Sequence, residues 1–122
     1  MFEVSVRSSF SGAHRLRGYR GKCEELHGHN WDVEVFVGAN KLSKTGLALD
    51  FKLFKKKLDD VLARLDHCDL NKLAYFKNIN PSAENIARYI YINLNKSLKI
   101  KGVKLTRVSV WETKDSCATY FE

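Results

Sequence analysis

The sequence has few of the features of exported, membrane-spanning or disulfide-bonded proteins. Its 122 residues include one proline and three cysteines. An odd number of cysteines favours free thiols in a reducing compartment over a disulfide framework. No apolar run approaches the roughly 18 residues of a membrane-spanning helix, and the opening MFEVSVRSSF lacks the apolar core of a signal peptide. We therefore expect a cytoplasmic protein with no membrane partner.

The remaining composition is that of a globular domain with excess positive charge. Hydrophobic residues make up 44% and charged residues 29%, as in ordinary soluble domains, so we expect one domain over residues 1–122. The 21 basic and 14 acidic residues give a net charge of +7. This favours an anionic partner, nucleic acid or a phosphorylated small molecule, unless it is only a solvated basic surface. Dispersed lysines and the lack of an RNP-like motif or basic arm lead us to expect no nucleic acid.

Alternating apolar residues predict four strands. The alternation is loose over residues 2–10 and strict over 31–37, where the apolar side chains share one face. Residues 12–26, with three glycines and many charges, are expected to form a loop between these strands. Residues 103–111 and 117–121 are predicted to form the last two strands, joined by a tight turn.

Two amphipathic helices are predicted between the second and third strands. Asp50 is the expected N-cap of the first, whose apolar residues follow at spacings of three and four until the helix ends near Asp66. Its expected buried residues are Phe51, Phe54, Leu58, Val61, Leu62 and Leu65. Ser82 follows the only proline and is expected to cap the second helix. The order β-β-α-α-β-β favours an α+β fold, a four-stranded antiparallel sheet with both helices on one face. The uncovered face and edges of such a sheet favour self-association.

The stretch CEELHGHNW contains three side chains of the metal-ligand type. His27 and His29 are two residues apart, so on a strand they project to the same side. His14, near the far end of the first strand, reaches the same place if the two strands pair. Three histidines with an open fourth position are typical of a catalytic zinc site. The alternative is a turn with solvated imidazole rings.

Cys23 has two interpretations that the residues alone do not separate. The three-residue spacer before His27 allows the thiol to fold back as a fourth ligand, although one cysteine with three histidines is an uncommon closed zinc site. A thiol beside the metal but not bound to it would instead act as a base or nucleophile.

The same stretch also matches the first half-motif of the cupins, from Gly21 through the two histidines to Glu34. The second half-motif, with its proline-containing turn, has no counterpart, because the only proline, Pro81, precedes a helix. Two long amphipathic helices also argue against a small all-β barrel. We therefore reject the cupin fold.

Three acidic positions and one further histidine complete the candidate site. Asp66 and His67 are an acid–base pair in which the carboxylate fixes the imidazole tautomer. Alternatively, His67 is only a favourable cation at a helix C-terminus. Glu112 continues an apolar strand face and suits recognition of an amino-pyrimidine edge, or is a solvated strand-end charge. Glu84 could simply favour the N-terminus of the second helix.

Taken in order, these stretches resemble the 6-pyruvoyltetrahydropterin synthase family over nearly the whole chain. The resemblance is carried by FSGAHRL, CEELHGHNW, LDFKLFK, LDHCDLN, NPSAENIA and WETKDSCATY. The three-residue spacer between the cysteine and HGH is similar to that of the bacterial branch, the 6-carboxytetrahydropterin synthases of queuosine biosynthesis. Animal pyruvoyl synthases have a longer spacer there.

The resemblance implies a tunnelling fold whose subunits form a trimeric β-barrel, two trimers stacking as a homohexamer with active sites at subunit interfaces. It implies one zinc ion per subunit on His14, His27 and His29, and it leaves Cys23 off the metal as the catalytic thiol. Glu112 then anchors the pterin.

The remaining implied roles concern the proton relay and the start of the second helix. Asp66 and His67 form the relay. Ser82 and Glu84 are implied to contact substrate, with Ala83 standing where relatives often have serine.

The implied reaction converts 7,8-dihydroneopterin triphosphate to 6-carboxytetrahydropterin, with release of acetaldehyde and triphosphate. The alternatives are a pyruvoyl-type synthase and a non-enzymatic zinc-binding module.

Overall fold

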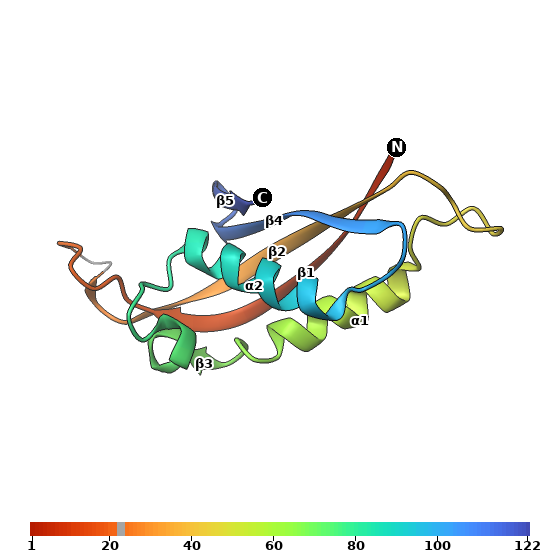
Figure 1. The fold of residues 1–122 in the computed structure, drawn as a ribbon. Coiled ribbons are helices and arrows are strands. Elements are labelled where there is room, and N and C mark those ends of the chain that lie inside the picture. Colours follow the sequence, from red (N-terminus) through yellow and green to blue (C-terminus); the bar gives the residue numbers. More distant parts are fainter. Residues whose placement is uncertain (22–23) are drawn as a thin grey trace.

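The computed structural model describes residues 1–21 and 24–122, which form one β-sheet with two α-helices on one of its faces (Figure 1). The strands and helices follow in the order predicted, with a short strand and two 3₁₀ turns inserted between the helices. The elements are β1 (Phe2–His14), β2 (His27–Ala39), α1 (Phe51–Leu62), β3 (Cys68–Asp69), η2 (Leu70–Lys72), η3 (Ala74–Phe76), α2 (Ala83–Ser97), β4 (Val103–Thr113) and β5 (Ser116–Tyr120).

The sheet has five strands in the order β3-β1-β2-β4-β5 and is mixed, which corrects the prediction of four antiparallel strands. The three pairings among the four long strands are antiparallel as predicted, but β3 pairs in parallel with the outer edge of β1, Gly12 opposite Cys68. A two-residue strand has no periodicity to detect. It forms because the backbone after α1 returns along the free edge of β1.

The first two strands are longer than the alternation of apolar residues indicated. β1 continues to His14 and β2 begins at His27, so the loop predicted over residues 12–26 starts later than predicted but ends at the predicted position. Their pairing is continuous from Phe2 opposite Ala39 to His14 opposite His27. Backbone hydrogen bonds therefore extend the hairpin beyond the point at which its side chains alternate.

The core lies between the sheet and the helices. From Trp31 to Val37 the alternate side chains of β2 have no exposed area, as expected for a strand beneath helices. The helix α1 packs on β1, and α2 packs on β4 and β5 (Figure 1). Burial of these apolar faces supplies the main stabilisation, about 25 cal/mol for each Å² removed from water.

Both helices begin where their N-caps were predicted, but α1 ends earlier than predicted. The side chains of Asp50 and Ser82 accept hydrogen bonds from backbone N–H groups of the first turns of α1 and α2, as predicted. The helix α1 ends at Leu62 rather than near Asp66, because residues 63–67 form turns that lead into β3. Phe51, predicted to be buried, is 54% exposed.

No helix among the described residues has the length and apolar character needed to span a membrane.

Candidate metal centre

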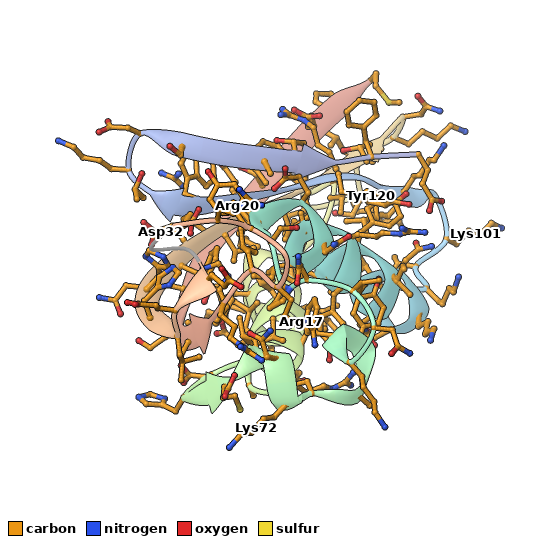
Figure 2. All side chains as sticks on the ribbon, turned by 90° about the vertical axis from the view of Figure 1, so that its left-hand side faces the viewer. Arg17, Arg20, Asp32, Lys72, Lys101 and Tyr120 are labelled. Carbon is orange, nitrogen blue, oxygen red and sulfur yellow. The ribbon has the colours of Figure 1, made fainter. Side chains whose placement is uncertain are left out.

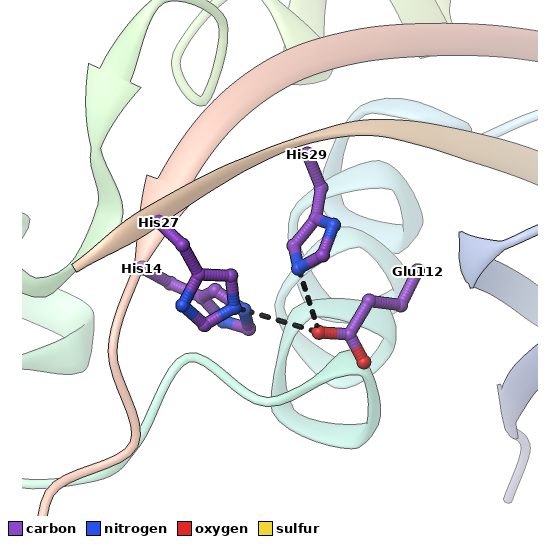
Figure 3. A group of neighbouring side chains, drawn as sticks. All are labelled: His14, His27, His29 and Glu112. Carbon is purple, nitrogen blue, oxygen red and sulfur yellow. Dashed lines mark hydrogen bonds and ion pairs between the residues drawn. The ribbon is translucent and has the colours of Figure 1, made fainter. Parts of the chain in front are cut away.

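Three histidines meet where β1 ends and β2 begins, on the helix-covered face of the sheet (Figure 3). His14 lies directly opposite His27 in the antiparallel pairing, and Gly12 lies opposite His29. Because side chains two residues apart share a face of a strand, this register brings all three rings to one side. Gly12 is buried, and a Cβ at this position would lie only 3.3–3.4 Å from atoms of Phe10, Leu65 and Leu70.

The nitrogens of these rings converge with one carboxylate oxygen. Nε2 of His14 lies 3.1 Å from Nε2 of His27. Oε1 of Glu112, from β4, lies 3.0 Å from Nε2 of His29 and 3.2 Å from Nε2 of His14. The four ligand-type atoms lie within 4.8 Å of one another. The predicted histidine set is thus brought together, with a carboxylate that was predicted to have another role.

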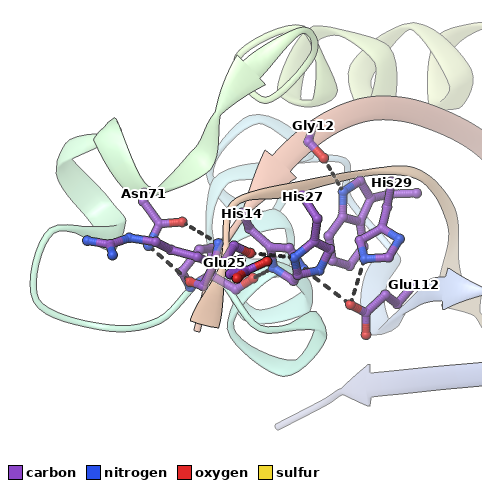
Figure 4. Close-up of polar contacts among 10 residues, drawn as sticks. Gly12, His14, Glu25, His27, His29, Asn71 and Glu112 are labelled. Atoms are coloured by element: carbon purple, nitrogen blue, oxygen red, sulfur yellow. Dashed lines mark hydrogen bonds and ion pairs between the residues drawn. The ribbon is translucent and has the colours of Figure 1, made fainter. Parts of the chain in front are cut away.

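Backbone carbonyl groups select which nitrogen of two rings faces the cluster. Nδ1 of His14 is 2.6 Å from the carbonyl oxygen of Pro81, and Nδ1 of His27 is 2.8 Å from that of Glu25 (Figure 4). A carbonyl oxygen only accepts hydrogen bonds, so each Nδ1 carries the proton and each neutral ring has a bare Nε2. Two lone pairs therefore face each other across 3.1 Å between His14 and His27. A metal ion or a shared proton between the two nitrogens would remove their repulsion.

Nε2 of His29 is buried and has no hydrogen-bond partner. Its 3.0 Å approach to Glu112 meets the distance of an ion pair but not the geometry of a hydrogen bond. Burial lowers the pKa of His29, and the neighbouring His14 and His27 lower it further, whereas Glu112 acts in the opposite direction. The ring is thus favoured in its neutral form, which is the form that binds metals.

This donor set fits a metal ion better than any other occupant. Three imidazoles converge, and two of them have outward N–H groups held by backbone carbonyl oxygens, which is the usual arrangement around a histidine-bound metal. The indole ring of Trp31 packs edge-to-face against two of these rings. Its centroid lies 4.9 Å from that of His14 and 5.2 Å from that of His29. Trp31 is itself fixed by donating to the carbonyl oxygen of Gly12 over 3.1 Å.

The predicted acid–base pair lies along the other edge of β1. Nδ1 of His67 is 3.0 Å from Oδ2 of Asp66, and the other carboxylate oxygen accepts from the backbone N–H of Ser11 at 2.9 Å. The Ser11 bond is the largest cause of the lowered pKa of Asp66, with contributions from His67. His67 has φ of 56°, a left-handed conformation that is uncommon for residues with a side chain. Such strain is often retained at functional positions.

A shallow cleft of about 440 Å³ lies over the ends of β1, β2 and β3 and is centred on the sheet face opposite the histidine rings, because Gly28 and Asn30 alternate with His27 and His29 along β2. Its lining includes His67 and His29 and, between them, Ser11, Gly28 and Asn30. Within the described ranges His67 makes no hydrogen bond or ion pair with the histidine cluster. The described residues therefore do not bring the acid–base pair into contact with the histidine cluster.

The remaining predicted residues are placed as follows. Ser82 accepts from the backbone N–H of Asn85 at 3.2 Å, so its hydroxyl caps α2. Glu84 is exposed in the first turn of α2 and, with Glu112, lines a pocket of about 340 Å³ against β5. Cys23, the predicted catalytic thiol, lies outside the described residues.

The residues that orient the histidines were not predicted from the sequence. Pro81 and Glu25 act through their carbonyl oxygens, and backbone groups leave no mark on residue type. Asn80 has a weak signal, since Asn-Pro marks a turn. The role of this turn depends on the fold, which brings the carbonyl oxygen of Pro81 to Nδ1 of His14.

The fold and this cluster describe an α+β protein with a candidate catalytic metal centre at one end of its sheet. The chain matches the family described as 6-pyruvoyl tetrahydropterin synthase over residues 3–122. It is 38% identical over 127 residues to the 6-carboxy-5,6,7,8-tetrahydropterin synthase of Synechocystis, covering 99% of this chain and 94% of that protein. It is 42% identical over 109 residues to the dihydroneopterin monophosphate aldolase of Pyrococcus furiosus, covering 89% and 88%.

A solved structure gives the same result. The 6-pyruvoyl tetrahydropterin synthase of Caenorhabditis elegans superposes with a TM-score of 0.88 at 30% identity, over 99% of this chain and 95% of that one. The chain belongs to the 6-pyruvoyl tetrahydropterin synthase family. The resemblance read from the sequence is confirmed, and with it the prediction that the chain is an enzyme of this pterin synthase and lyase class.

Proposed function

We propose that the chain is a zinc-dependent 6-carboxytetrahydropterin synthase. Its substrate is 7,8-dihydroneopterin triphosphate, and with one water it yields 6-carboxy-5,6,7,8-tetrahydropterin, acetaldehyde and triphosphate. The observation that carries the proposal is the convergence of three histidine Nε2 atoms, from His14, His27 and His29, in one cluster. The Synechocystis relative of that name covers nearly the whole chain and supports the choice of reaction.

The three histidines would hold the metal. A zinc ion there would polarise the adjacent side-chain hydroxyl groups of the substrate and lower their pKa, as it does for bound water. Imidazole ligands also suit copper, iron and nickel, so the choice of zinc comes from the family resemblance.

The proton transfers belong to side chains of this chain. The Nδ1–H group of His67 donates a hydrogen bond to the carboxylate of Asp66. Nε2 of His67 is then free to take up or deliver a proton in the cleft. Cys23 is proposed as the base that moves protons between the side-chain carbons and the ring. Two proton-transfer groups, one a thiol and one an imidazole, provide the acid and the base that the rearrangement requires.

Substrate recognition is assigned to the pocket next to β5. The carboxylates of Glu112 and Glu84 line it, and they would accept hydrogen bonds from the amino-pyrimidine edge of a pterin. Ser82 lies in the adjoining turn. The net charge of +7 favours approach of a triphosphate.

The assembly and the cellular role are part of the same proposal. One domain over residues 1–122, trimers closed through their sheets and stacked as a homohexamer, and sites completed at subunit interfaces follow the family resemblance. A free polar sheet face and an exposed β5 edge are consistent with such closure. The proposed setting is queuosine (7-deazaguanine) biosynthesis in the cytoplasm.

A second candidate is an aldolase acting on dihydroneopterin monophosphate. The 42% identity with the Pyrococcus furiosus protein favours it. Such an enzyme cleaves the bond between the first and second side-chain carbons and leaves a hydroxymethyl group on the pterin. The phosphate stays on the released aldehyde. A pyruvoyl-type synthase, in contrast, releases triphosphate and no aldehyde.

Product analysis separates the three reactions. Purified, zinc-loaded protein is incubated with the triphosphate and, separately, with the monophosphate of 7,8-dihydroneopterin. The proposal expects 6-carboxytetrahydropterin, acetaldehyde and triphosphate from the first substrate, with Cys23→Ala inactive. A hydroxymethyl product would establish the aldolase, and a pyruvoyl product without acetaldehyde would establish the third reaction.

A further inference from the structure

A groove of about 580 Å³ lies at the end of the sheet opposite the histidine cluster. It lies between residues 40–49, which join β2 to α1, and residues 98–104, which join α2 to β4 and begin that strand (Figure 1). β2 runs from His27 in the cluster to Ala39 next to the groove. At about 3.3 Å per residue, the two places are roughly 40 Å apart. The groove is therefore separate from the candidate metal centre.

The floor of the groove is apolar. Side chains of Leu42, Leu47, Ile100 and Val103 line it. Leu42 and Leu47 are 42% and 45% exposed, so a ligand in the groove would remove their apolar surface from water, which stabilises the complex by about 25 cal/mol for each Å². The volume lies within the range of about 300–1,000 Å³ that is usual for ligand pockets.

Hydrogen bonds hold the first connection in one shape. The backbone N–H of Ser43 donates to the carbonyl oxygen of Leu47 at 2.8 Å, and that of Gly46 donates to the carbonyl oxygen of Ser43 at 2.9 Å. The hydroxyl of Ser43 accepts from the backbone N–H of Leu47 at 3.2 Å. Gly46 has φ of 83°, which glycine adopts without strain. The groove is thus formed before a ligand binds, which lowers the entropic cost of binding.

The two connections carry positive charge and no negative charge. Residues 40–49 and 98–104 contain no acidic residue, and their basic residues are Lys41, Lys44, Lys99, Lys101 and Lys104. All five lysines are exposed, and within the part of the chain that the structure describes their ammonium groups make no hydrogen bond or ion pair, unlike those of Lys55 and Lys56. Asp50, the next acidic residue along the chain, caps α1. This end of the molecule therefore attracts anions.

The residue types of this surface favour one class of anionic partner. Nucleic acids are commonly bound by arginine and aromatic side chains that stack on bases, and residues 40–49 and 98–104 contain neither. The absence of arginine also removes the planar fork that binds phosphate in a bidentate manner. A single small anion between Lys41 and Lys101, which both line the groove, would leave the other lysines without a partner. Several carboxylates on either side of an apolar side chain would contact both the lysines and the floor.

We propose that this groove is a docking site for an acidic peptide segment of a partner protein. Leucine-type side chains of that segment occupy the apolar floor, and its carboxylates pair with the lysines around it. Such charge pairs at the rim of an interface mainly increase the association rate and make binding sensitive to salt. The proposal concerns a surface far from the metal and does not rest on the reaction that the chain catalyses.

The first experiment titrates the full-length protein into short, fluorescently labelled peptides and follows their anisotropy. One peptide has acidic residues on both sides of a pair of leucines. In the comparison peptides, serines replace the leucines, or the neutral amides replace the acidic residues. The proposal expects binding of the first peptide alone, weakened by added salt. No binding of that peptide, or equal binding of the serine peptide, would overturn the proposal, the latter because only a solvated basic surface would be present.

Lys101→Glu and Lys114→Glu are the matched pair of variants. Both replace an exposed lysine in a turn and change the net charge equally, but Lys114 follows β4 at the end away from the groove. Lys101→Glu should weaken binding of the leucine peptide roughly 5- to 10-fold, because a surface ion pair is replaced by a repulsion. Lys114→Glu should leave it nearly unchanged. Equal weakening in the two variants would overturn the proposal, since the attraction would then depend only on net charge.

Leu47→Ser tests the apolar floor. Leu47 is partly exposed, so the variant should fold, which circular dichroism checks. It should weaken binding of the leucine peptide about 10-fold, as the loss of a buried leucine contact of 1.4 kcal/mol does. Unchanged affinity would overturn the role of the groove. Vesicles containing an anionic lipid are titrated in parallel, and binding of vesicles without binding of the leucine peptide would assign the surface to a membrane instead.

Turnover of 7,8-dihydroneopterin triphosphate is measured on the same variants. It should be unchanged in Lys101→Glu and Leu47→Ser, because the histidine cluster lies at the other end of β2. Loss of turnover in both folded variants would make the groove part of the catalytic site and overturn the proposal. A parent protein that binds the leucine peptide but does not turn over the pterin retains the docking site and refutes only the proposed function.

Discussion

Nδ1 of His14 donates a hydrogen bond to the carbonyl oxygen of Pro81 across 2.6 Å. The two residues are 67 positions apart in the sequence, one at the end of β1 and the other just before α2. His14 is 1% exposed, so water does not replace this acceptor. The turn before α2 therefore decides which nitrogen of His14 faces the metal centre.

A clamp between Arg17 and Asn80 holds that turn in place. The side-chain oxygen of Asn80 accepts from the backbone N–H of Arg17 at 2.9 Å, and its amide donates to the carbonyl oxygen of Arg17 at 3.0 Å. The guanidinium of Arg17 also donates to the carbonyl oxygens of Lys77 and Ile79. Figure 2 looks onto this end of the molecule, with Arg17 near the centre of the view.

We predict that Asn80→Ala weakens metal binding without removing a ligand. Loss of the clamp frees the Pro81 carbonyl, and disruption of an outer-shell partner typically costs roughly 10- to 100-fold in metal affinity. Competition with a chromophoric chelator measures the dissociation constant, and thermal unfolding measures stability.

Asn71→Ala is the matched control for this variant. Asn71 makes the same pair of bonds to the backbone of Arg15, at 2.8 and 3.1 Å, but does not belong to the turn that carries Pro81 (Figure 4). Both variants should lose stability, and Asn80→Ala should lose more metal affinity. Equal affinities in the two variants would show that Asn80 is only structural.

The second prediction separates ligand from base. His27→Ala should lose bound zinc as well as activity, because it removes one of three converging Nε2 atoms. Cys23→Ala should lose activity and keep the metal. Metal content by atomic absorption, with lyase activity measured on the same samples, checks both. Zinc-free Cys23→Ala protein would make Cys23 a ligand.

The third prediction concerns the backbone of His67. At φ of 56° a residue with a Cβ is strained by about 1–2 kcal/mol, a cost that glycine does not have. His67→Gly should therefore be more stable than His67→Ala by about 1 kcal/mol, reduced by the greater freedom of glycine in the unfolded chain. Both lose the imidazole and should be equally inactive. Urea unfolding at neutral pH compares them, and a more stable His67→Ala would argue against strain at this position.

The fourth prediction is a pH dependence that comes from Asp66. Its pKa is lowered in the folded protein, first by the Ser11 N–H and then by His67, from an ordinary value of 3.8. The unfolded chain therefore binds a proton more readily, so stability rises with pH across this interval. The contribution is complete above the ordinary pKa and is lost as the pH falls through the lower folded value.

Replacing Asp66 with asparagine tests this directly. Asp66→Asn cannot titrate, so its unfolding free energy should fall less steeply than that of the parent between roughly pH 5 and pH 2. The other carboxylates titrate in both proteins and cancel in the difference. Identical slopes would mean that the folded and unfolded pKa values of Asp66 are the same.

The sequence alone determined the secondary structure order, the helix N-caps and the identity of the metal-type residues. Apolar spacing is a local property, so it predicted two strands, two helices and two further strands in the right order. The HGH stretch likewise predicted that the side chains of His27 and His29 share one face, because they are two residues apart on one strand. His14 joined it on the single assumption that β1 and β2 pair, which the register of His14 opposite His27 confirms.

Only the tertiary structure decided where the backbone groups and the carboxylate lie. The parallel strand β3, the turn of Pro81 behind His14 and the approach of Glu112 to the histidines all join segments more than 50 residues apart. Such contacts depend on how the helices pack on the sheet, and carbonyl oxygens are present at every residue whatever its side chain. The metal-type residues were therefore identifiable from the residue types, whereas the hydrogen bonds that orient their rings and the position of Glu112 were set by the packing.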